Sequence, residues 1–132
     1  MDNKFEEFDR IMREDPGFIK EMGITLTELS EGYAKGRIIL EKKHMNPMGT
    51  VHGGLIFALA DTIGGRAAMT YGSQVVTLNS SVSFLNAAAN TEYIEAEANV
   101  VRAGRTSVFD VMIRTKEGVD VAKAVMTFYR IG

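Results

Sequence analysis

The chain has 132 residues and a formal net charge of −2, with 45% hydrophobic and 24% charged residues. This length and composition predict a single globular domain spanning residues 1–132. Lysine and arginine are scattered and form no basic stripe, so we expect no nucleic-acid partner. The absence of cysteine excludes disulfides and thiolate metal sites.

Membrane and secretion signals are weak. The uncharged run at residues 51–60 falls short of the roughly 20 apolar residues that span a bilayer. The first residues are acidic and amphipathic, which is not typical of a signal peptide. We therefore expect a cytoplasmic protein with no membrane partner.

Two short helices are predicted within an N-terminal segment, residues 1–22. Phe5, Phe8 and Met12 are spaced three and four apart, which is typical of an amphipathic helix covering a hydrophobic edge. Asp15-Pro16 predicts the N-cap and first position of a second helix that Gly23 ends.

From residue 24 the hydrophobic period changes to two. A hairpin is predicted over residues 24–41, with its turn at residues 30–32. Four further strands are predicted over residues 76–84, 94–100 and 109–114, and from about residue 119 to 131. The expected fold is α+β, with about six antiparallel strands and one long helix. One helix covers one face of a sheet, so we expect the other face or an edge to contact another subunit in a homo-oligomer.

The long helix, residues 53–71 with Gly72 at its end, carries an acid in an unusual place. On a helical wheel Asp61 lies on a face of mostly small side chains, whereas another side is shared by Leu55, Leu59, Thr62 and Arg66. An acid on a face that permits close approach is partly desolvated, which is typical of a functional group. The alternative is an ordinary solvent-facing residue.

The segment before this acid completes a plausible site. Residues 46–54 read Asn-Pro-Met-Gly-Thr-Val-His-Gly-Gly, a turn that leads into the helix. A helix N-terminus and a fixed carboxylate can act together on one small electrophile.

These residues resemble the signature of a known family. Asn46, Gly49 and His52-Gly53-Gly54, with Asp61 nine residues after the histidine, are similar to hotdog-fold acyl-CoA thioesterases of the phenylacetate-degradation (PaaI-like) type. The resemblance extends from about residue 17 over nearly the whole chain. It implies a hotdog fold, with one long central helix wrapped by the sheet, and hydrolysis of an acyl-CoA thioester to free acid and CoA.

The resemblance also implies roles for individual residues. The backbone N–H of Gly53 would polarise the thioester carbonyl, and Asp61 would reach the site from the neighbouring subunit as nucleophile or general base. Asn46 and His52 would orient the carbonyl or the water, and Thr77 would help to hold the water.

Each of these smaller roles has a plain structural alternative. Asn46 can be only a turn residue, His52 only a helix cap, and Thr77 a threonine that packs in a strand.

Coenzyme A, as part of the substrate, is the expected binding partner, and no separate cofactor is expected. Arg102 and Arg105 flank a turn close to where the family binds the nucleotide end, with Gly104 and Thr106 as further contacts. The alternative is a solvated hairpin end.

We expect a dimer or a dimer of dimers (a homotetramer). From the resemblance we also expect the acyl group of the substrate to be an aryl-acetyl or other aromatic group.

Other chemistries fit less well. His44, His52 and Asp61 do not have the spacing of a known metal site, and no Gly-x-Ser-x-Gly elbow or phosphate-binding glycine loop occurs. Two alternatives to hydrolysis remain open: dehydration or another hotdog reaction on an acyl thioester, and a non-catalytic acyl-CoA-binding module.

Overall fold

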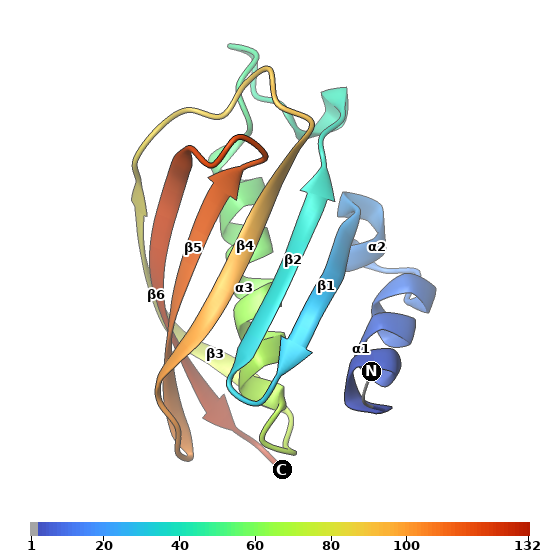
Figure 1. The fold of residues 1–132 in the computed structure, drawn as a ribbon, viewed down its shortest axis with the longest axis vertical. Helices are drawn as coiled ribbons and strands as arrows, with labels where there is room; N and C mark the ends of the chain where they lie inside the picture. The colour runs from blue at the N-terminus through green and yellow to red at the C-terminus, as the bar shows by residue number, and fades with distance from the viewer. Residues whose placement is uncertain (1–2) are drawn as a thin grey trace.

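The computed structural model describes residues 3–132, and its main feature is a sheet with one long helix against it (Figure 1). Two short helices, α1 (Asn3–Glu14) and α2 (Phe18–Met22), precede the sheet, and α3 (Gly53–Met69) lies against one of its faces. Within the described residues, no helix combines the length and apolar character that crossing a membrane requires.

The sheet has six antiparallel strands in the order β1-β2-β4-β5-β6-β3. Their bounds are Ile24–Ser30 (β1), Tyr33–Ile39 (β2), Val75–Phe84 (β3), Tyr93–Arg102 (β4), Thr106–Thr115 (β5) and Asp120–Arg130 (β6). A 3₁₀ turn, η1 (Lys42–His44), follows β2. The predicted α+β architecture with six antiparallel strands and one long helix is thereby confirmed.

Small residues let α3 sit close to the sheet. Along β2 and β4 the side chains that face the core are mostly small, and all are buried: Ala34, Gly36, Ile38, Ile94, Ala96 and Ala98. The Ile63 side chain of α3 rests directly over Gly36. On the other half of the sheet Phe128 meets Phe109 edge to face, at 6.1 Å between ring centroids.

The predicted start of the second helix is wrong. Gly17 is the N-cap of α2, and Asp15 and Pro16 precede the helix. The Asp15 carboxylate accepts a hydrogen bond from the Gly17 N–H at 3.3 Å, so the side chain forms a local turn of the kind favoured by aspartate. The predicted stop at Gly23 is confirmed, since this residue has φ 76° in the left-handed region.

The long helix also ends two residues before the predicted Tyr71. The Thr70 hydroxyl donates to the Ala67 carbonyl at 2.6 Å and accepts from the Gly32 N–H at 2.9 Å. This buried threonine ties the end of α3 to the β1–β2 turn and closes the helix at Met69.

A substitution at Gly36 tests the close contact between α3 and β2. A Cβ atom at this position would overlap with the Thr25 carbonyl oxygen of the neighbouring strand and with Ile63. We expect Gly36→Ala to lower the free energy of unfolding by about 1–3 kcal/mol, measured by urea denaturation. Gly65→Ala is the control, because its added methyl would lie 3.8 Å from Phe128 and alanine favours a helix. Equal stability of the two variants would contradict this account of the packing.

Candidate active site

Asn46 stabilises the turn before α3. Its side-chain oxygen accepts hydrogen bonds from the N–H groups of Met48 at 3.0 Å and Thr50 at 3.1 Å. Its amide nitrogen donates to the Thr50 hydroxyl at 2.8 Å. The structure thus shows Asn46 in the role of a turn residue, which leaves its predicted contact with a substrate carbonyl as a prediction.

His44 is buried and serves the fold. Its Nδ1 accepts a hydrogen bond from the Glu41 N–H at 2.9 Å, so Nε2 carries the proton and donates to the Met22 carbonyl, also at 2.9 Å. The ring therefore joins η1 to the end of α2. In the part of the chain that the structure describes, no three histidine, cysteine or acidic side chains are grouped as metal ligands would be.

His52 is the N-cap of α3. Its Nδ1 accepts a hydrogen bond from the Gly54 N–H at 2.8 Å, and its backbone carbonyl accepts from Leu55 at 3.0 Å and from Ile56 at 3.3 Å. Gly54 leaves room for this ring, because a Cβ atom there would lie 3.0 Å from the His52 Nδ1. His52 thus satisfies two of the four N–H groups that a helix start leaves free, those of Gly54 and Leu55, and its own N–H donates to the His44 carbonyl at 2.9 Å.

The remaining N–H of the first turn belongs to Gly53. No hydrogen-bond acceptor for it occurs among residues 3–132. The packing of the chain leaves space here, since a Cβ atom on Gly53 would meet only the Phe84 ring, at an ordinary 3.5 Å. Gly53 therefore presents an unused donor at the positive end of the α3 dipole, beside an exposed aromatic ring.

Asp61 is half-buried and is held by a neighbouring strand. The Thr77 hydroxyl of β3 donates to Asp61 Oδ1 at 2.6 Å. Both side chains line a pocket of about 180 Å³, whose wall also includes Thr62, Gly65 and Arg66 of α3. The structure thus brings together two of the predicted site residues and fixes the orientation of the carboxylate.

Arg66 is a site residue that the sequence pattern did not indicate. A helical wheel places it on another side of α3 from Asp61, yet both line the same pocket. Five helical positions separate them by about 140° around the axis, and the long arginine side chain spans that difference. Burial lowers the pKa of Arg66, while the carboxylates of Asp15 and Asp61 oppose this shift.

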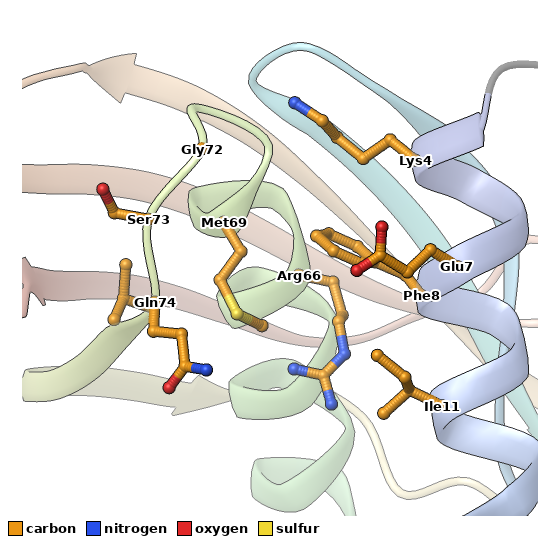
Figure 2. A pocket seen from close by; sticks show the side chains of 10 residues that line it. Lys4, Glu7, Phe8, Ile11, Arg66, Met69, Gly72, Ser73 and Gln74 are labelled. Atoms are coloured by element: carbon orange, nitrogen blue, oxygen red, sulfur yellow. The ribbon is translucent and has the colours of Figure 1, made fainter. Parts of the chain in front are cut away.

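Arg66 also lines a second and larger pocket, of about 730 Å³, between α1 and the end of α3 (Figure 2). Its other walls include Phe8 and Ile11 of α1, Met69 of α3 and Val75 of β3. Arg66, Met69 and Val75 belong to both pockets, so the two spaces adjoin.

A single chain does not bring Gly53 and Asp61 together. They are eight residues apart on one helix, a rise of about 12 Å along its axis. One small electrophile cannot contact both groups of the same chain.

The turn between β4 and β5, with Arg102, Gly104, Arg105 and Thr106, lies far from Gly53. The Arg105 carbonyl accepts a hydrogen bond from Arg130 at 2.8 Å, and Arg130 pairs with Val75 at the start of β3. Gly53 lies beside Phe84 at the other end of this strand, and β3 spans about 30 Å from Val75 to Phe84. Contact of these four residues with CoA therefore stays a prediction.

Comparisons with known proteins show the family to which the chain belongs. A family profile described as Thioesterase superfamily matches residues 48–122, more than half of the chain. Acyl-coenzyme A thioesterase PaaI of Escherichia coli is 28% identical over 100% of this chain and 95% of its own. Acyl-coenzyme A thioesterase 13 of Mus musculus is 28% identical over 83% of this chain and 80% of its own.

Solved structures match as well. The structure of E. coli PaaI superposes with a TM-score of 0.90 and covers 98% of this chain and 94% of its own, at 28% identity. A thioesterase from Streptococcus pneumoniae with coenzyme A has a TM-score of 0.78 at 31% identity and covers 83% of this chain and 86% of its own. The chain therefore belongs to the thioesterase superfamily, with a hotdog fold of the PaaI-like type.

Proposed function

We propose that this protein hydrolyses acyl-CoA thioesters. The observation that carries the proposal is that one helix holds both a carboxylate fixed by a hydroxyl, Asp61 with Thr77, and a free N–H at its first residue, Gly53. These are the two groups that acyl transfer from a thioester needs: one that delivers oxygen and one that stabilises charge on the carbonyl oxygen.

Asp61 supplies the oxygen directly or through water. As a general base it takes a proton from water while the water oxygen attacks the carbonyl carbon. As a nucleophile it forms a mixed anhydride that water then cleaves. In both routes the carbon–sulfur bond breaks, the CoA sulfur leaves with a proton, and the acid is released.

The helix start stabilises the negative charge that develops on the carbonyl oxygen. The Gly53 N–H donates to this oxygen, and the helix dipole adds a positive field. His52 acts by holding the first turn through its bond to the Gly54 N–H, and Asn46 acts by holding the turn before it.

Two chains are needed for one complete site, because Gly53 and Asp61 of one helix are too far apart. Strand β3 offers the contact: it lies at the edge of the sheet, beside β6 alone. Apolar side chains along it are exposed, with Val76 at 44%, Leu78 at 57% and Phe84 at 58%. An unpaired apolar edge is a template for pairing with a second copy.

The outer face of the sheet is less suited to this contact. It carries ion pairs between neighbouring strands, such as Arg37 with Glu95 at 2.8 Å and Arg114 with Glu97 at 3.8 Å. We therefore propose a dimer formed along β3, in which Gly53 of one chain faces Asp61 of the other.

The pneumococcal relative supports the choice of residues. Alanine variants of that thioesterase have been solved at an aspartate and at a threonine sixteen positions apart in its chain. Asp61 and Thr77 have the same separation. Another structure of that protein contains coenzyme A, which supports a CoA ester as the substrate here.

Removing the Asp61 charge tests the chemistry. We expect Asp61→Asn to lower kcat for release of thiol from acyl-CoA by at least about 100-fold, because a neutral amide neither attacks nor takes a proton. Thr77→Val should lower kcat less, since the carboxylate stays but loses its orientation. Asp110→Asn, which changes a half-buried acid in β5, is the control and should keep the wild-type rate. An unchanged rate in Asp61→Asn would refute the assignment.

Proline at position 53 removes the N–H that we assign to the carbonyl oxygen. The first helical position tolerates proline, and His52 already has the extended backbone that proline requires, with φ −63° and ψ 134°. We expect Gly53→Pro to fold and to lose about 100-fold or more in kcat, while Gly53→Ala keeps most of the rate. Circular dichroism checks the fold, and full activity in Gly53→Pro would exclude this donor.

Mixing the two inactive variants tests whether a site spans two chains. Asp61→Asn and Gly53→Pro, refolded together in equal amounts, should form mixed dimers in which one of the two sites has both native groups. About a quarter of the wild-type activity should return. If each chain holds its own complete site, the mixture will be as inactive as either variant alone.

A further inference from the structure

Arg66 is a charged side chain that the reaction above does not use. It is half-buried, and none of the hydrogen bonds or ion pairs found within residues 3–132 involves its guanidinium. Lys4, which lines the larger pocket with it, donates instead to the Thr70 carbonyl. Arginine stays protonated in proteins, so its charge is buried in part without a direct counter-ion.

The position of Arg66 connects it to the proposed chemistry. It lines the pocket that contains Asp61 and Thr77, and also the larger one under α1. Figure 2 shows its side chain extending between Met69 of α3 and Ile11 of α1. Along the helix axis Asp61 and Arg66 are about 7.5 Å apart. A substrate whose thioester carbonyl lies at Asp61 can therefore extend either its acyl group or its CoA portion toward this guanidinium.

The charges around the pocket determine which part of the substrate can bind there, the nucleotide end of CoA or the acyl group. The nucleotide end of CoA carries several phosphate groups and needs several cations. The carboxylates of Glu7, Asp15 and Asp61 lie in or near this space, and Arg66 is the only cation lining it that has no hydrogen-bonded partner among the described residues. This balance disfavours a polyphosphate. It permits a single carboxylate, which matches the planar guanidinium with two parallel hydrogen bonds.

The walls beside Arg66 suit a short hydrocarbon chain. Phe8, Ile11, Met69 and Val75 line the larger pocket, and they provide apolar contact on the way to the guanidinium. A neutral alkyl chain in the same place would remove water from the half-buried Arg66 and would offer its guanidinium no hydrogen-bond acceptor. Such an unpaired buried group is costly, so the site should discriminate against neutral chains of this length.

We propose that Arg66 determines specificity by binding a carboxylate at the far end of the acyl group, so that the preferred substrates are CoA thioesters of dicarboxylic acids. This inference rests on the proposed hydrolase function and adds the class of acyl group.

Esters of equal carbon number, with and without the terminal carboxylate, test the proposal. The pairs are glutaryl- and pentanoyl-CoA, adipyl- and hexanoyl-CoA, and suberyl- and octanoyl-CoA, with phenylacetyl-CoA as an aromatic ester. We expect the wild type to favour the dicarboxylic ester of at least one pair by tenfold or more in kcat/KM. Arg66→Met should lower kcat/KM for that dicarboxylic ester at least tenfold. The same variant should leave kcat/KM for the neutral esters unchanged or higher.

Further variants separate the specific role from a structural one. Arg66→Lys keeps a charge and should retain part of the preference, whereas Arg66→Gln should lose it. Arg10→Met is the matched control, because Arg10 lies on the exposed side of α1 and pairs with Glu14 at 3.2 Å. Thermal unfolding confirms that each variant is folded before its kinetics are compared.

The possible outcomes are distinct. If the wild type hydrolyses neutral or phenylacetyl esters as well as dicarboxylic ones, and Arg66→Met does not change the ratio, the inference is wrong and the hydrolase function stands. If Arg66→Met slows every ester equally, Arg66 acts on CoA or on Asp61. That result would also overturn the inference that Arg66 binds a terminal carboxylate. If the wild type cleaves no ester, the hydrolase proposal fails and this inference fails with it.

Discussion

The close contact between α3 and the small residues of the sheet determines where every group of the site lies. With Gly36, Ala96 and Ala98 beneath it, the helix packs near the backbone of β2 and β4, and Ile63 fills the space over Gly36. Because packed interiors do not deform continuously, this contact sets the position of the whole helix against β3. Thr77 then meets Asp61, and Phe84 lies beside Gly53.

The same rigid helix separates the two groups on which the proposed reaction depends. Gly53 and Asp61 are about 12 Å apart along its axis, too far for one carbonyl to contact both. In the reaction that we propose, each chain therefore carries two half-sites, one at the helix start and one at its middle. The exposed apolar side chains of β3 lie next to both halves, so pairing along this edge would complete two sites at once.

The local hydrogen bonds change how the motif at residues 46–54 is understood. Asn46 and His52 have most of their polar atoms engaged within the turn and the first helical turn. Their visible effect is to shape the backbone and to leave the Gly53 N–H as the one free donor among the described first-turn groups. A residue can thus contribute to a site by accepting hydrogen bonds from the neighbouring N–H groups, so that one N–H group stays free for the substrate. Such a residue need not contact the substrate itself.

Hydrophobic periodicity was enough to predict six strands, one long helix and the candidate acid, because periods of 2 and 3.6 follow directly from backbone geometry. The sequence likewise placed Asp61 on a small-residue face and Gly53 at a helix start. Only the tertiary structure decided that Thr77 binds Asp61, that Arg66 shares its pocket, and that the Arg102–Thr106 turn lies at the far end of the sheet from Gly53. Those relations join residues far apart in the chain or on different sides of a helix, and they depend on strand order and side-chain reach, which local pattern does not encode.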